Sequence, residues 1–144
     1  MPAVYFDSSA LVKLLVAEEG TDLVQDLWNS CDAALTTRLA YPEVRAALHA
    51  GARDQRLTDR ELASAESAWE SLWAGVRPVE LTARVARAAG GLAGALRLSG
   101  ADAVHLAGAL ALEDDEVVMA VWDRRLHAGA VASGLRVAPS SLAT

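Results

Sequence analysis

The sequence predicts an α/β fold: a three-layer α/β/α sandwich around a mainly parallel, roughly five-stranded central sheet. Short β-prone runs alternate with segments that carry apolar residues at helical spacing, an order typical of parallel sheets with right-handed crossovers. The chain has 144 residues, of which 53% are hydrophobic and 22% are charged. This length and composition predict one domain over residues 1–144 with its own core, and they exclude a disordered tail or linker.

The first strand and the helix after it form the first pair of elements. Val4-Tyr5-Phe6 is a short β-prone run that stops abruptly at Asp7, which places Asp7 at the carboxyl end of a strand. Ser8 and Ser9 are residue types that cap helices, and good helix formers follow over residues 10–17. We therefore expect a strand, a tight turn and a helix in this order.

A second helix, a second strand and a third helix are expected next. The second helix, over residues 21–29, has one apolar face made of Leu23, Val24, Leu27 and Trp28. Residues 33–36 form the second strand, and Thr37 is a candidate cap for the helix that carries Glu43. Pro42 fits only the first turn of that helix, because it would kink the helix further in.

The middle of the chain contains a capping box and a proline-containing strand. Thr58-Asp59-Arg60-Glu61 opens a helix whose apolar stripe consists of Leu62, Ala65, Trp69, Leu72 and Trp73. A stripe with tryptophans at this spacing is more typical of a core than of an interface. Residues 76–81 resemble a strand, and Pro78 favours an edge position or a strand start.

Two helices and two strands complete the chain. Residues 82–98 are Ala-rich and helical, although Gly90, Gly91 and Gly94 weaken this helix or allow close packing on it. A further helix over 101–112 follows, and residues 117–122 are apolar throughout, as a strand buried on both faces should be. Asp123 ends that strand, and a helix to about residue 132 and a short strand at 135–137 follow.

Charge and cysteine content bear on partners and compartment. The chain has 13 basic and 19 acidic residues and a net charge of −6, which by itself argues against a nucleic-acid binder. Cys31 is the only cysteine, so no intramolecular disulfide can form and a reducing cytoplasm is expected. We find neither a signal-peptide pattern nor an apolar stretch near the ~20 residues of a membrane helix.

Four carboxylates occupy positions that folding alone does not explain well. Asp7 and Asp123 each end an apolar strand, and Glu43 and Asp102 lie near helix starts among apolar neighbours. Sites in parallel sheets form beyond the carboxyl ends of the strands, so we expect these groups to gather there. Gathered like charges repel unless a cation compensates, and hard oxygen ligands select Mg²⁺ or Mn²⁺.

The plainer interpretation makes the aspartates helix caps or first-turn residues that favour the helix dipole. Taken one at a time, Asp7, Asp102 and Asp123 all fit that interpretation, whereas Glu43 is not obviously explained by capping. Taken together around one predicted pocket, the four carboxylates favour a metal site.

Four segments, in this order and spacing, resemble the PIN-domain ribonucleases and most closely the VapC toxins of bacterial toxin–antitoxin pairs. The matching segments are residues 4–13, 42–48, 102–107 and 121–126. Residues 50–98 match only in their helical character.

The resemblance implies a PIN-like fold and an endoribonuclease that cuts single-stranded or looped RNA with Mg²⁺ or Mn²⁺. It implies that Asp7, Glu43, Asp102 and Asp123 are the catalytic, metal-binding carboxylates. It also implies a VapB-like antitoxin as partner, a homodimer and a toxin–antitoxin hetero-oligomer. Since four of the acidic residues belong to the proposed site, the net charge does not exclude RNA as the substrate.

Several polar residues near these segments have two interpretations each. Ser8 and Ser9 contact a metal-bound water or phosphate, or they only cap a helix. Arg124 and Arg125 are candidate RNA contacts, and Arg38, Arg45, Arg53, Arg56 and Arg60 form either a phosphate-binding rim or solvated helix faces.

The three histidines and one acidic run are interpreted more plainly. His105 is either a proton donor in the pocket or a structural or partly exposed residue, and it shares a helix face with Asp102. His49 and His127 are interpreted as surface residues. The acidic run at 113–116 is interpreted as a solvated turn.

Other function classes fit less well. A catalytically silent PIN-like module that binds RNA or protein is the main alternative, although all four acids are present. A phospho-acceptor receiver domain needs a lysine near its last strands, but Lys13, the only lysine, lies in the first helix. A dehalogenase-like phosphatase needs a second aspartate where Ser9 stands.

Overall fold

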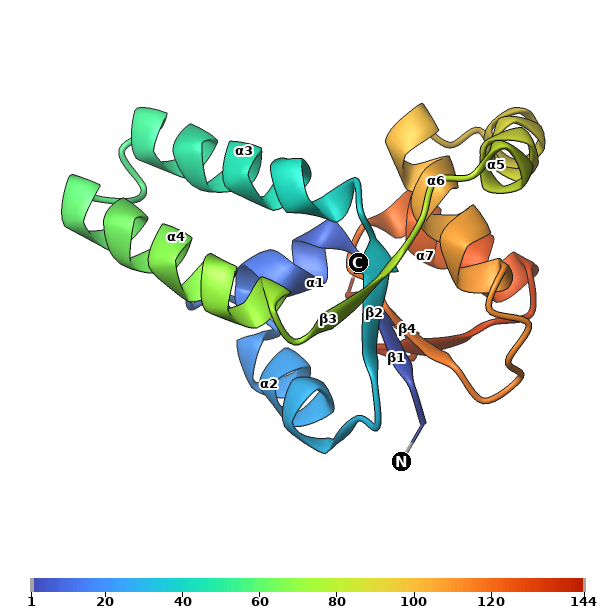
Figure 1. Cartoon of the computed structure of the whole chain (residues 1–144), viewed down its shortest axis with the longest axis horizontal. Coiled ribbons are helices and arrows are strands. Elements are labelled where there is room, and N and C mark those ends of the chain that lie inside the picture. The colour runs from blue at the N-terminus through green and yellow to red at the C-terminus, as the bar shows by residue number, and fades with distance from the viewer. Residues whose placement is uncertain (1, 144) are drawn as a thin grey trace.

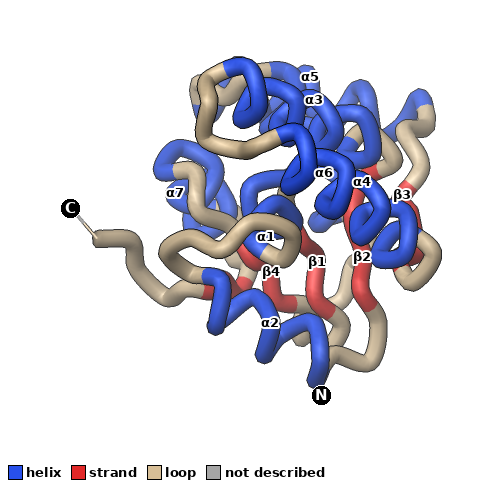
Figure 2. Tube along the Cα trace, turned by 90° about the vertical axis from the view of Figure 1, so that its left-hand side faces the viewer, coloured by secondary structure: helices blue, strands red, loops and turns tan. Residues whose placement is uncertain are grey.

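The computed structural model describes residues 2–143, and a parallel sheet crosses its centre (Figure 1). The order across the sheet is β3-β2-β1-β4-β5, and every neighbouring pair is parallel. The strands are β1 (Val4–Phe6), β2 (Ala34–Thr37), β3 (Val76–Val79), β4 (Val118–Ala120) and β5 (Arg136–Ala138). The view in Figure 2 shows β4, β1, β2 and β3 side by side. The predicted five-stranded parallel sheet is confirmed.

Helices cover both faces of the sheet. They are α1 (Ser8–Lys13), α2 (Thr21–Ser30), α3 (Ala40–Arg53), α4 (Asp59–Trp73), α5 (Ala83–Leu96), α6 (Gly100–Leu110) and α7 (Arg124–Ala132). In Figure 1, α1 to α4 lie on one side of the sheet and α5 to α7 on the other. The α/β/α sandwich predicted from the alternation of elements is therefore confirmed.

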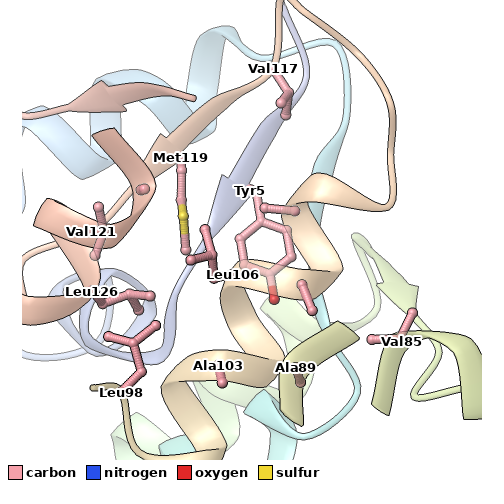
Figure 3. Packing of buried hydrophobic residues seen from close by; sticks show 13 residues of the cluster. Tyr5, Val85, Ala89, Leu98, Ala103, Leu106, Val117, Met119, Val121 and Leu126 are labelled. Atoms are coloured by element: carbon pink, nitrogen blue, oxygen red, sulfur yellow. The ribbon is translucent and has the colours of Figure 1, made fainter. Parts of the chain in front are cut away.

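Alternate residues of the central strands point into two separate cores. In β1, Tyr5 faces α5, α6 and α7, where it packs among Leu106, Met119 and Leu126 (Figure 3). Val4 and Phe6 face the opposite core under α1 to α4. A strand that is apolar on both faces must be covered on both faces, which is why β1 and β4 lie inside the sheet.

Aromatic side chains fill the core under α4. Trp69 is fully buried and stacks on Tyr41 of α3, with ring centroids 6.1 Å apart, and Trp73 contacts both rings. The predicted core role of the tryptophan stripe is confirmed at Trp69. The capping box of α4 is present as well, because Thr58 and Glu61 each accept a hydrogen bond from the other's backbone N–H.

The structure corrects several element boundaries. The helix expected over residues 10–17 is α1, which ends at Lys13. It begins at Ser8, because Asp7 rather than a serine is its N-cap. Thr37 does not cap α3 but belongs to β2, and its hydroxyl accepts a hydrogen bond from Leu39 N–H. Pro78 lies on an edge strand as predicted, but β3 ends at Val79 rather than at residue 81.

The glycines of α5 bear on how closely other elements pack against this helix. Gly90, Gly91 and Gly94 lie within one uninterrupted helix, and a Cβ at any of them would meet no other side chain within 4 Å. Close packing through these glycines is therefore not observed. Across residues 2–143, no helix is both long and apolar enough to cross a membrane.

Candidate active site

The four predicted carboxylates all belong to turns that start helices beside the sheet. Asp7 follows β1 and caps α1, and Asp123 follows β4 and caps α7. Since β1 and β4 are parallel neighbours, their carboxyl ends share one edge of the sheet. Glu43 and Asp102 lie in the first turns of α3 and α6. Capping by Asp7 and Asp123 and the first-turn position of Asp102 are thus confirmed.

Asp7 is the most buried of these acids, with only 3% of its surface exposed. Its Oδ1 accepts a hydrogen bond from Ala10 N–H at 2.8 Å, and the Ser9 hydroxyl donates to the same carboxylate at 2.7 Å. The pKa of Asp7 is raised to about 6, mainly by burial and in addition by the charge of Asp102, although His105, Ala10 and Ser9 oppose the shift. The fold therefore holds a carboxylate where its negative charge is unfavourable.

The pKa of Asp102 is affected by the charges of the other acids. Burial raises the pKa of Asp102 first, and the negative charges of Asp123 and Glu43 raise it further. Asp123 is exposed, and its Oδ1 accepts a hydrogen bond from Leu126 N–H at 2.9 Å. The raised pKa of Asp102 indicates that Asp123 and Glu43, which are distant in the sequence, lie close enough to act on its charge.

Glu43 is held by two hydrogen bonds. The Ser8 hydroxyl donates to Glu43 Oε1 at 2.7 Å, and His105 Nε2 lies 2.7 Å from the same oxygen. Burial by itself raises the pKa of Glu43, but the hydrogen bonds from His105 and Ser8 outweigh it and leave this pKa below its usual range. Glu43 is therefore ionised and fixed in place at neutral pH.

His105 lies inside the protein. Only 2% of its surface is exposed, so it is not a partly exposed residue, and its Nε2 contacts both Glu43 and Ser8. Its Nδ1 lies 3.0 Å from the Tyr5 hydroxyl, which also accepts a hydrogen bond from Thr37 N–H at 3.1 Å. Sequence reasoning missed Tyr5 as a polar residue of the site, because it stands in an apolar strand. The only available signal was the presence of a hydroxyl between two fully apolar neighbours.

The donor chemistry of the site fits a hard divalent cation. All four acids supply carboxylate oxygens, and their mutual repulsion is the kind that a cation relieves. As they stand, however, no three His, Cys, Asp or Glu side chains within residues 2–143 are placed so that they could hold a metal ion together.

The two serines differ from the expectation that one of them caps a helix. Both lie in the first turn of α1, where Ser8 donates to Glu43 and Ser9 donates to Asp7. Their hydroxyls therefore support two of the four acids rather than the helix start.

A small basic pocket lies beside Asp123. Its volume is about 180 Å³, and it is lined by Lys13, Glu19, Trp122, Arg124, Leu142 and Ala143. Lys13 Nζ lies 5.2 Å from the centre of the Trp122 ring and donates to Glu18 Oε1 at 3.0 Å. Arg124 donates a hydrogen bond to the carbonyl oxygen of Ala143. Arg125 is exposed on the first turn of α7. The sequence predicted the arginines, but it did not indicate that Lys13 lies near them.

The other basic residues mostly pair with acids or lie far from the strand ends. Arg38 pairs with Glu80, Arg45 with Glu66, and Arg56 with Asp54. The turn between α3 and α4, which includes Arg56, projects away from the sheet (Figure 1). These contacts favour the interpretation of solvated helix faces.

The remaining two histidines, His49 and His127, differ in their exposure to solvent. His49 is a surface residue as expected, and it lies 2.7 Å from Glu66. The surface interpretation of His127 is wrong: it is 8% exposed, and its Nε2 lies 2.8 Å from the carbonyl oxygen of Pro139. His127 lies one helical turn after Asp123, the cap of α7, and it contacts the segment that follows β5. A contact between these two segments cannot be predicted from either one alone.

Comparison with known proteins gives a consistent result. The model of the PIN domain family matches residues 4–129. Two relatives are Ribonuclease VapC45 (Mycobacterium tuberculosis, strain CDC 1551 / Oshkosh) and Ribonuclease VapC49 (Mycobacterium tuberculosis, strain ATCC 25618 / H37Rv). Each is 64% identical to this chain over 142 residues, and the match covers 99% of this chain and 99% of the relative.

Solved structures share the fold at low sequence identity. Mycobacterium tuberculosis VapC20, described as a sarcin-ricin loop cleaving toxin, is similar with a TM-score of 0.65 and 19% identity, over 92% of this chain and 95% of that one. VapBC2 from Rickettsia felis, bound to a promoter DNA fragment, gives a TM-score of 0.62 at 9% identity, over 99% of each chain. From the family match and the 64% identity, the chain belongs to the PIN-domain family and, within it, to the VapC-type ribonuclease toxins.

Proposed function

We propose that this chain is a metal-dependent endoribonuclease that hydrolyses RNA phosphodiester bonds at the carboxyl edge of the sheet. The observation that carries the proposal is a buried Asp7 at the carboxyl end of β1, with the charge of Asp102 raising its pKa and the charges of Asp123 and Glu43 raising the pKa of Asp102. The relatives at 64% identity are named ribonucleases, which supports RNA as the substrate class.

Asp7, Glu43, Asp102 and Asp123 are the residues that would hold Mg²⁺ or Mn²⁺. When bound, such a cation neutralises their repulsion, attracts the scissile phosphate and promotes attack by water on phosphorus. The chain's own part is positioning: Ala10 N–H fixes the Asp7 carboxylate, and Ser8 fixes that of Glu43. Preorganised groups need little rearrangement during reaction, which is how such sites lower a barrier.

The pocket beside Asp123 supports a place for the RNA backbone. Arg124 brings a cationic side chain to its wall, Lys13 lies beside it with its charge paired to Glu18, and Trp122 adds an aromatic surface on which a base can stack. Arg125, in the same turn as Arg124, and the hydroxyls of Ser8 and Ser9 are further candidates for phosphate contact. We expect binding outside the acidic site to be local and weakened by salt.

The proposal includes partners. The relatives' VapC names and the Rickettsia felis VapBC2 complex support a VapB-like antitoxin as the protein that holds this toxin inactive. A homodimer, a toxin–antitoxin hetero-oligomer and a cytoplasmic location belong to the same proposal. Light scattering during size-exclusion chromatography measures the oligomer, and co-expression with the product of a small adjacent reading frame tests the antitoxin.

The decisive experiment uses purified chain freed of any partner and total RNA as the probe. We expect cleavage with Mg²⁺ or Mn²⁺, loss of cleavage with EDTA, and loss of cleavage in Asp7→Asn. Asp26→Asn, an exposed α2 residue, is the matched control for the change in charge and should cleave RNA normally. Cleavage that survives EDTA or Asp7→Asn would refute a metal nuclease, and RNA binding without cleavage would favour a catalytically silent module.

A further inference from the structure

A buried chain of hydrogen bonds connects the backbone of β2 to the Glu43 carboxylate. Thr37 N–H donates to the Tyr5 hydroxyl at 3.1 Å, and that hydroxyl lies 3.0 Å from His105 Nδ1. His105 Nε2 in turn lies 2.7 Å from Glu43 Oε1. We propose that Tyr5 and His105 form a positioning pair, which fixes the Glu43 carboxylate with Oε1 occupied and Oε2 left for a cation. This inference rests on the proposed metal-dependent function.

The hydrogen-bond geometry assigns a hydrogen to Nε2 of His105. A nitrogen lone pair 2.7 Å from a carboxylate oxygen would be repelled, so the nitrogen facing Glu43 must be a donor. The Ser8 hydroxyl donates to the same oxygen and also lies 3.1 Å from Nε2, which a shared N–H accommodates. Both the neutral and the charged imidazole carry a hydrogen at this position, so donation to Glu43 does not depend on the charge of the ring.

Tyr5 fixes which way the imidazole ring faces. Its oxygen accepts from Thr37 N–H, which leaves its own hydrogen to donate to Nδ1 of the neutral ring. The two rings also meet edge to face, with centroids 5.9 Å apart and an interplanar angle of 86°. Tyr5 is fully buried and His105 nearly so, so water does not replace a lost contact.

The position of His105 on α6 ties it to the acidic site. It follows Asp102 by one helical turn, so the helix start that presents Asp102 also presents the imidazole to Glu43. No donor within residues 2–143 engages Glu43 Oε2, whereas Oε1 receives both Ser8 and His105. The pair therefore controls the orientation of Glu43 from outside the proposed coordination shell.

The test compares variants that remove one contact at a time. Tyr5→Phe removes only the hydroxyl, His105→Asn withdraws the donor from Glu43, and His105→Gln returns an amide N–H near the place of Nε2. Tyr41→Phe is the matched control, because it also removes one tyrosine hydroxyl. Tyr41 lies two residues before Glu43 on α3, but its hydroxyl contacts Glu70 on α4 and not Glu43. Circular dichroism first shows which variants fold.

Three readouts are measured: Mn²⁺ affinity by calorimetry, cleavage of total RNA, and the tautomer of His105 by long-range ¹H–¹⁵N NMR. We expect His105→Asn to weaken Mn²⁺ binding and cleavage by about 10- to 100-fold, the range for groups that orient a ligand. We expect Tyr5→Phe to weaken both less, His105→Gln to recover part of the loss, and Tyr41→Phe to match wild type. NMR of the wild type should show Nε2 protonated, and Tyr5→Phe should lower that preference.

The outcomes separate the positioning role from the proposed function. Wild-type chain that binds no Mn²⁺ would overturn the proposed function, and this inference with it. Wild-type binding that folded Tyr5→Phe and His105→Asn both retain would overturn the positioning pair alone. A wild-type tautomer with hydrogen on Nδ1 and none on Nε2 would also overturn it, even if His105→Asn fails to fold.

Discussion

Replacing Asp7 by asparagine should stabilise the metal-free fold while it abolishes activity. Asp7 is almost completely buried, and its pKa is raised from an ordinary 3.8 to about 6. At about 1.4 kcal/mol per tenfold change in proton affinity, keeping this carboxylate ionised in the fold costs about 3 kcal/mol. Asparagine removes the charge and keeps an oxygen for Ala10 N–H, but it loses about 1 kcal/mol of hydrogen bonding with Ser9. The expected net gain is about 2 kcal/mol in the free energy of unfolding.

The sign of the pH dependence follows from the raised pKa. Between about pH 4 and pH 6 the folded chain binds a proton at Asp7 that the unfolded chain has released, so protonation favours the fold. The wild type should therefore lose stability as the pH rises through this window, relative to Asp7→Asn. Below pH 4 the cost of the charge is absent, so the asparagine variant should be less stable by the lost hydrogen bonding of about 1 kcal/mol. Above pH 7 it should be more stable by the net amount of about 2 kcal/mol.

The assay is urea denaturation in EDTA from pH 4 to pH 8, followed by circular dichroism. Asp26→Asn controls for the loss of one negative charge at an exposed position. If Asp7→Asn is as stable as wild type or less stable at pH 7.5, or if the difference does not grow with pH, the argument from burial is wrong. In a second measurement without EDTA, Mn²⁺ should raise the unfolding free energy of the wild type and not that of Asp7→Asn, because a ligand that binds only the folded state stabilises it.

Three further variants test the packing and the helix starts by urea denaturation. Trp69→Ala should cost about 3–5 kcal/mol, because Trp69 is fully buried among aromatic neighbours, and a loss below about 1 kcal/mol would contradict its core role. Thr58→Ala should cost about 1 kcal/mol by removing one half of the capping box, and an unchanged midpoint would mean that the cap adds nothing. Gly20→Ala should cost about 1–3 kcal/mol, since φ is +94° and a Cβ there would lie 2.9 Å from the Trp122 ring. An unchanged unfolding free energy would contradict both the backbone strain and the contact with the ring.

The sequence predicted the elements well wherever apolar runs and caps are local signals. The strand that begins at Val4 and the capping box at Thr58 are both recognisable within a few residues. The start of α1 was placed late because Ser8 and Ser9 are good caps in isolation. Their hydroxyls instead support Glu43 and Asp7, and the Ser8 contact spans 35 positions in the chain, which a local pattern cannot reveal.

The candidate site was predicted as a set of residues but not as a geometry. Strand ends and helix starts indicated which acids would meet, since parallel neighbours share a carboxyl edge. The contact of His105 with Glu43 spans 62 positions and that of Tyr5 with His105 spans 100. These contacts depend on how α6 packs against β1 and β2, so nothing in either segment alone indicates them.

Capping and metal binding at Asp7 and Asp123 are compatible at the level of single oxygens. At Asp123 the cap uses Oδ1, and no donor within residues 2–143 engages Oδ2. At Asp7 the backbone of Ala10 also binds Oδ1, and only the rotatable hydroxyl of Ser9 reaches Oδ2. A cap therefore fixes each carboxylate at a strand end by one oxygen and leaves the other available to a cation. The same hydrogen bonds, together with the favourable helix start, let the fold keep acids close together that would otherwise repel. Four of the 19 acidic residues belong to the proposed site, so the net charge of −6 is not a guide to the charge of the substrate.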